Sequence, residues 1–296
     1  MVVSFVNAGL LTLAESISVI MGANIGTTVT AWIISIFGFK VDMAAFALPL
    51  LAIALPLIFS GKSNRKSIGE FIFGFSFLFM GLSYLKANAP DLNANPEMLA
   101  FVQNYTDMGF FSILLFLFIG TILTMIVQAS AATMAITLIM CANGWISLEL
   151  GAALVLGENI GTTITAVLAS IGTDRTAKQA CAAHVLFNVI GVCIFLTILP
   201  LYQELIAMTA TGIAHQIANA HTLFNVFNTI IVLPFVKPFA ALIRRLLPDK
   251  AHKVVEGAQY LDPKLIEATP GIAVEAVKNE CAYMGFLVIH LLDSVQ

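Results

Sequence analysis

Two copies of a short polar motif lie in a largely apolar chain, and their residue types are suited to binding ions. Residues 22–28 are GANIGTT and residues 157–163 are GENIGTT. The glycines let backbone approach a ligand, the asparagine offers an amide, and the threonine hydroxyls coordinate cations or donate to anions. Where such a helix is broken, its N-terminal N–H groups suit an oxyanion and its freed carbonyls suit Na⁺. The alternative is that these small residues serve close helix packing.

A second polar cluster, QASAAT at residues 128–133, follows directly after an apolar run. Small residues around Gln128 and Ser130 suit the tip of a re-entrant hairpin. The alternative is that these hydroxyl groups bond their own helix backbone, as they often do in membrane helices.

Three titratable residues lie in or near the motifs. Glu158 stands where the first copy has Ala23. A carboxylate inside the membrane is costly, so Glu158 is expected to neutralise Na⁺ or take up a proton, unless it is a rim residue that reaches water. His184 and His221 each open an HxLFN sequence, 37 residues apart. Such histidines bind ligands or relay protons, or they fix helix contacts by hydrogen bonding.

Composition places these motifs in a lipid bilayer. Of the 296 residues, 59% are hydrophobic and only 10% are charged, which is too little charge to cover an ordinary soluble domain. The net charge of −3 offers no basic surface for nucleic acid. The chain contains neither HExxH nor GxSxG, so we expect that it is not an enzyme.

The expected elements are helices, because a membrane-spanning helix needs about 20 apolar residues. Residues 16–37 and 130–170 are apolar but interrupted by Gly, Asn, Ser and Thr, which predicts re-entrant hairpins or unwound helices. The predicted fold class is an all-α integral membrane protein with inverted-topology repeats. The clearest spans are residues 43–60, 68–85, 110–128, 177–201 and 220–236.

The repeat is a gapless match between residues 22–35 and 157–170, identical at 9 of 14 positions with an offset of 135. The match continues upstream, where Gly9 and Leu13 fall on Gly144 and Leu148. Basic loops are expected in the cytoplasm, and this rule gives the two halves opposite topology.

Four parts are predicted along the chain. Met1 aligns with Ile136, so the counterpart of QASAAT would precede Met1. We expect that the chain is a fragment; the alternative is a degenerate first repeat. The parts are a first repeat at 1–86, an extracytoplasmic loop at 87–109, a second repeat at 110–247 and a cytoplasmic tail at 248–296. An apolar helix stripe in the tail should pack on absent sequence, another subunit or the membrane surface: Val274, Val277, Cys281, Met284, Val288, Leu291 and Val295.

The three motifs together resemble those of the type II sodium/phosphate cotransporter family, in which inverted repeats each carry a QSSS-type and a GxNIGTT-type stretch. QASAAT departs from QSSS at Ala129 and Ala131, which removes two hydroxyl groups. The tail LDPKLIEATPGIAVEAVKNE is similar to the opening of a PhoU-like helical domain that bacterial members append. The resemblance covers nearly the whole chain.

Site residues follow from this resemblance by position, with Glu158 added for its charge. The implied phosphate contacts are Gln128, Ser130, Thr133, Thr162, Thr163, Thr27 and Thr28. The implied sodium contacts are Gln128, Asn24, Asn159, Glu158 and Thr165.

The resemblance implies sodium-coupled transport of inorganic phosphate across the cytoplasmic (inner) membrane by alternating access. Sodium would be the coupling ion, with no other cofactor. Phosphate, sodium and the lipid bilayer are the expected partners, and a homodimer or a protein bound by the tail is compatible with the sequence. The alternative is a phosphate-responsive regulatory membrane protein that acts through its PhoU-like tail.

Overall fold

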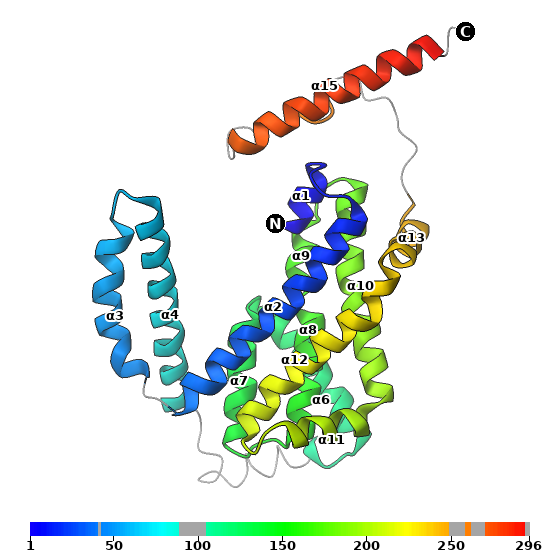
Figure 1. The fold of residues 1–296 in the computed structure, drawn as a ribbon. Coiled ribbons are helices and arrows are strands. Elements are labelled where there is room, and N and C mark those ends of the chain that lie inside the picture. Colours follow the sequence, from blue (N-terminus) through cyan, green and yellow to red (C-terminus); the bar gives the residue numbers. More distant parts are fainter. Residues whose placement is uncertain (41–42, 89–104, 249–257, 262–269, 294–296) are drawn as a thin grey trace. The chain divides into compact units, whose positions relative to one another are not determined.

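The computed structural model describes residues 1–40, 43–88, 105–248, 258–261 and 270–293, and every regular element in these ranges is a helix (Figure 1). Within the described ranges, six helical segments are long and apolar enough to cross a membrane. This confirms the predicted all-α membrane fold. The predicted loop at 87–109 lies mostly outside the described residues, as do large parts of the tail.

The helices follow one another along the chain as labelled in Figure 1. In the first half they are α1 (Val2–Asn7), α2 (Leu13–Lys40), α3 (Met43–Ile58) and α4 (Ser63–Ala87). The next group comprises α6 (Phe110–Val127), α7 (Ser130–Ala142), α8 (Leu148–Gly161) and α9 (Ile164–Ala169). The last group comprises α10 (Arg175–Thr197), α11 (Leu199–Thr209), α12 (Ile213–Val232), the 3-10 helix η1 (Leu233–Phe235), α13 (Val236–Leu246) and α15 (Pro270–Asp293).

The two glycine-rich segments differ in their helical continuity. In the second copy the helix is interrupted at Thr162 and Thr163, between α8 and α9, as predicted. In the first copy the prediction of a hairpin or unwound helix over residues 16–37 is wrong, because α2 runs unbroken through GANIGTT. An unbroken helix satisfies its backbone internally, which is the least costly arrangement where water is excluded.

The repeat is also visible in local geometry. Gly9 and Gly144 have left-handed φ values of 70° and 71° at equivalent positions, a conformation that glycine adopts without a Cβ penalty. Directly after this turn, α2 begins at Leu13 and α8 begins at Leu148, again 135 residues apart. The preceding residues Thr12 and Ser147 both cap their helices, accepting the N–H of Glu15 at 3.3 Å and of Leu150 at 3.3 Å. Each copy therefore folds into the same turn and helix start.

Two compact units are formed by residues distant in sequence. The first unit contains residues 1–22, 165–187 and 230–296. Within it, the amide oxygen of Asn7 accepts the Asp174 N–H at 2.8 Å, and Gln179 donates to the Leu247 carbonyl at 2.7 Å. These bonds tie the end of α1 to the residue before α10, and the residue after α13 to the first turns of α10.

The second unit, residues 23–164 and 188–229, holds most of the motifs. Helices α6, α7 and α8 pack together in it, and α3 and α4 run side by side as a hairpin (Figure 1). Its apolar core includes Phe195, which contacts the rings of both Tyr202 and Phe224. The buried Tyr202 hydroxyl donates to the Ala220 carbonyl at 2.8 Å and so joins α11 to α12.

Helix α15 carries the predicted apolar stripe on its surface. Val274, Val277, Met284 and Val288 are all exposed, so nothing in the described chain covers this face. The side chains of Leu291 and Val295, which complete the predicted stripe, lie outside the described residues.

Candidate functional site

The QASAAT cluster sits at a break between two helices. Helix α6 ends at Val127, Gln128 has a left-handed φ of 56°, and Ala129 is extended before α7 begins at Ser130. A non-glycine residue with positive φ is uncommon and marks a site where the surrounding structure imposes the conformation. The backbone break predicted from this motif is therefore present, with Gln128 exposed and Ser130 half-buried.

The first turn of α7 lacks a side-chain cap, because alanine occupies its N-cap position. The N–H groups of Ala132 and Thr133 reach the Ala129 carbonyl at 3.0 Å and 3.2 Å. The N–H groups of Ser130 and Ala131 precede these bonds and have no intrahelical acceptor. This helix end can donate two backbone hydrogen bonds to an anion, aided by about half a positive charge from the helix dipole.

Thr133 connects the two motifs of the second half. Its hydroxyl is fully buried, donates to the Ser130 carbonyl at 3.1 Å and lies 3.2 Å from the hydroxyl of Thr124 on α6. Thr124 in turn contacts Gly161, since a Cβ placed on Gly161 would lie 2.7 Å from the Thr124 Cβ. QASAAT and GENIGTT are therefore adjacent through α6.

The glycines of GENIGTT allow α8 to approach the backbone of α6. A Cβ on Gly157 would lie 2.0 Å from the Leu117 carbonyl oxygen, and one on Gly120 would lie 2.4 Å from that of Leu154. The Thr121 hydroxyl also reaches the Gly157 carbonyl at 3.1 Å. The packing role considered for these glycines is thus confirmed in the second copy. For Gly22 in the first copy, the described residues leave open space.

Glu158 is buried inside the second unit, with 2% of its surface exposed. One carboxyl oxygen accepts a hydrogen bond from the Thr137 hydroxyl on α7 at 2.6 Å, and the other has no hydrogen-bond partner among the described residues. The alternative that Glu158 is a rim residue reaching water is therefore wrong. Both ion pairs in the described chain, Lys66–Glu70 and Lys278–Glu275, are exposed, so Glu158 has no basic partner in this part of the chain.

Asn159 contacts a residue that the sequence did not single out as a ligand. Its amide oxygen accepts a hydrogen bond from Asn225 on α12 at 3.0 Å, and its own NH₂ donates to the Val155 carbonyl at 2.7 Å. Asn225 belongs to the second HxLFN sequence, where only the histidine was considered. That repeated sequence was the available signal, and the asparagine carries the contact.

The threonines of the two motifs make equivalent bonds in each copy. Thr27 and Thr162 donate to carbonyls four residues earlier, at 3.0 Å and 2.8 Å. Thr28 and Thr163 donate to carbonyls three residues earlier, both at 2.7 Å. Because each hydroxyl hydrogen is donated to a carbonyl of its own segment, these hydroxyl groups suit a cation better than an anion.

The remaining predicted residues lie elsewhere. Asn24 is buried in α2 with 7% of its surface exposed. Thr165 is exposed in α9 and belongs to the first unit. No group of three or more His, Cys, Asp or Glu residues in the described chain is arranged to hold a metal ion.

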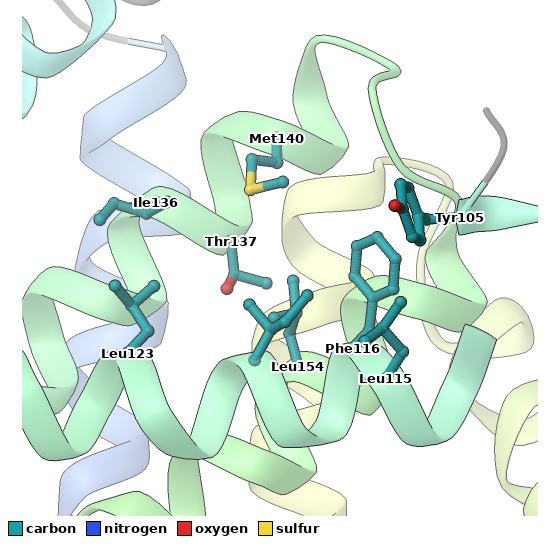
Figure 2. Close-up of a pocket in the computed structure, with 9 residues that line it drawn as sticks. Tyr105, Leu115, Phe116, Leu123, Ile136, Thr137, Met140 and Leu154 are labelled. Atoms are coloured by element: carbon teal, nitrogen blue, oxygen red, sulfur yellow. The ribbon is translucent and has the colours of Figure 1, made fainter. Parts of the chain in front are cut away.

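An apolar pocket of about 310 Å³ lies beside this region, between α6, α7 and α8 (Figure 2). Thr137, which holds Glu158, is one of the two lining side chains with a hydroxyl group, and Tyr105 is the other. The lining residues are Tyr105, Leu115, Phe116, Ile119, Leu123, Ile136, Thr137, Met140 and Leu154. Such a lining does not suit a phosphate ion.

The sequence profile of one protein family, described as Na⁺/Pi-cotransporter, matches residues 1–87 and 94–230. It therefore includes all three motifs and ends within α12. No solved structure matches the chain at a significant level.

Three relatives illustrate the range of similar proteins. The uncharacterized protein YqeW of Bacillus subtilis (strain 168) is 33% identical over 219 residues, covering 73% of this chain and 65% of YqeW. The putative inorganic phosphate export protein YjbB of Escherichia coli (strain K12) is 27% identical over 207 residues, covering 69% of this chain and 36% of YjbB. The sodium-dependent phosphate transport protein 2A of Ovis aries is 39% identical over 82 residues, 26% of this chain and 13% of that protein. The chain thus spans less than two thirds of these relatives.

Proposed function

Because this chain belongs to the Na⁺/Pi-cotransporter family, we propose that it transports inorganic phosphate across the cytoplasmic membrane with sodium as the coupling ion. The backbone break at Gln128 and Ala129 is the structural observation that carries the proposal. This break places the QASAAT cluster at an uncapped helix N-terminus, next to GENIGTT. The free backbone N–H groups at such a helix end are the donors that an oxyanion site requires.

Phosphate would bind at the first turn of α7. The N–H groups of Ser130 and Ala131 and the Ser130 hydroxyl supply donors, and the Gln128 amide lies at the same break. Thr133 is buried behind them and positions the turn through Thr124. The backbone donors explain how the site can work although two hydroxyl groups of the QSSS pattern are absent.

Sodium would bind nearby, and its ligands would be oxygen atoms rather than N–H or O–H donors. In this proposal Asn159 contributes its amide oxygen, Thr162 and Thr163 contribute hydroxyl oxygens, and Glu158 contributes negative charge. Asn24, Thr27 and Thr28 form the corresponding set in the first copy. A bound cation offsets the charge and the desolvation cost of the anion, so the two ions should bind cooperatively.

Transport would proceed by alternating access between halves of opposite topology, as duplicated transporter halves do. The tail after residue 248 would lie in the cytoplasm, because the last turn of α13 contains Arg244 and Arg245. The name of YjbB refers to export, so efflux of phosphate is the direction to test first.

Removing the Ser130 hydroxyl is expected to lower phosphate flux by about tenfold, because a charge-assisted hydrogen bond to the anion is lost. The measurement is ³²P-phosphate flux in proteoliposomes with and without an imposed Na⁺ gradient. Ser170→Ala is the matched control, since the Ser170 hydroxyl donates to the Val167 carbonyl of its own helix and contacts Cys181, and neither residue belongs to the three motifs. Flux from the unsubstituted protein that ignores the Na⁺ gradient would disprove sodium coupling, and equal flux from both variants would remove Ser130 from the site.

A further inference from the structure

One face of α12 is polar although it is buried. Asn225, Asn228 and Thr229 follow His221 by four, seven and eight residues, so all four project from one side of the helix. Their exposed fractions are 5%, 0%, 0% and 8%. Buried polar side chains normally have their hydrogen-bonding groups satisfied, so a face of this kind requires an explanation.

On this face, the amide oxygen of Asn225 and the hydroxyl oxygen of Thr229 have no hydrogen-bond partner among the described residues. The NH₂ group of Asn225 is fully used, because it donates to Asn159 at 3.0 Å and to the His221 carbonyl at 2.9 Å. What remains at Asn225 is therefore an acceptor, aimed into the protein where no donor meets it.

The amide oxygen of Asn159 also keeps capacity as an acceptor. Its NH₂ donates to the Val155 carbonyl, and its oxygen accepts one bond from Asn225, which leaves one lone pair. The hydrogen bond holds the two amide groups side by side, so their oxygens are neighbours. Thr229 adds a third oxygen one helical turn beyond Asn225.

Such a group selects the sign of its ligand. An anion needs donors, and both amide donors of Asn225 are spent inside the protein. A small cation needs oxygens, and among the described residues the amide oxygen of Asn225 and the hydroxyl oxygen of Thr229 have no hydrogen-bond partner. The adjacent Glu158 supplies a nearby carboxyl oxygen without a partner.

We propose that Asn225 and Thr229 of α12, together with Asn159 of α8, bind a monovalent cation, so that α12 forms a wall of the sodium site. This inference rests on the proposed sodium-coupled function and adds to it a helix outside the GxNIGTT and QASAAT motifs. Asn225 and Thr229 contact the ion, and α12 thereby links cation binding to the packing of α8.

The test measures phosphate flux in proteoliposomes as a function of Na⁺ concentration, at constant ionic strength with choline as the replacement cation. Asn225→Ala is expected to raise the half-saturating Na⁺ concentration by about tenfold, as for the loss of one good ligand. Thr229→Val should raise it several-fold. Because the Thr229 hydroxyl makes no hydrogen bond, this isosteric change leaves the fold intact even if Asn225→Ala impairs folding. Phosphate dependence at saturating Na⁺ should stay unchanged in both.

Asn219→Ala is the matched control, because Asn219 lies on the same helix but bonds the Thr209 hydroxyl at an exposed position. The unsubstituted protein could respond to Na⁺ while Asn225→Ala and Thr229→Val both behave like Asn219→Ala. The polar face of α12 would then be water-filled or structural, and the inference would fail although the proposed function stands. A change in phosphate dependence instead of Na⁺ dependence also overturns it. Flux that is independent of Na⁺ in the unsubstituted protein overturns both.

Discussion

Glu158→Gln is expected to change flux and stability in opposite directions. Glutamine has nearly the same shape and can still accept the Thr137 hydrogen bond, but it carries no charge. A buried carboxyl group without a basic partner destabilises the fold, so the free energy of unfolding should stay equal or rise by about 1 kcal/mol. Sodium-driven phosphate flux should fall by at least about tenfold, because the cation loses its negative neighbour.

Flux in proteoliposomes and thermal unfolding in detergent, the latter in sodium-free buffer, measure these two effects. Thr137→Val is the matched control, because it removes the hydrogen bond at 2.6 Å but keeps the carboxyl group. It should destabilise the protein by about 1 kcal/mol while Na⁺ dependence persists. A Glu158→Gln protein that is both less stable and inactive would indicate a structural role, and one with normal Na⁺-driven flux would remove Glu158 from the site.

Gly157→Ala is expected to cause the largest loss of stability. The added methyl group would lie 2.0 Å from the Leu117 carbonyl oxygen, which is backbone and cannot rotate away, so α6 and α8 must separate. Overpacking of this kind costs about 1–3 kcal/mol. The free energy of unfolding, measured by denaturation in mixed micelles, should fall by that amount, and flux should fall with it because Gly161 and Thr124 lose their contact.

The repeat provides a matched control at the equivalent position. Gly22→Ala is the same substitution in the same motif, but the described residues leave open space around Gly22 inside the unbroken helix α2. Alanine favours a helix over glycine by up to about 1 kcal/mol, so this variant should be as stable as the unsubstituted protein or slightly more stable. Equal losses in both variants would show that packing against α6 is not what Gly157 provides.

The sequence predicted the elements well because membrane helices have a strong signal. Long apolar runs bounded by charge predicted the spans that became α4, α6 and α10. The offset of 135 also predicted which residues would be equivalent, and Gly9 and Gly144 indeed adopt the same turn. The error was at residues 16–37, where glycine content suggested a break. Glycine permits unwinding but does not cause it, and α2 retains its backbone bonds.

For the candidate site too, some features were predictable from the sequence and others were not. The sequence by itself determined which residue types lie at the motifs and where the chain breaks near Gln128, because these depend on local conformation and on apolar context. Only the tertiary structure decided that Thr137 meets Glu158, that Asn225 meets Asn159, and that Gly157 contacts backbone while Gly22 does not. These outcomes depend on which helices pack together. A contact between residues 66 positions apart cannot be inferred from the local sequence around either residue.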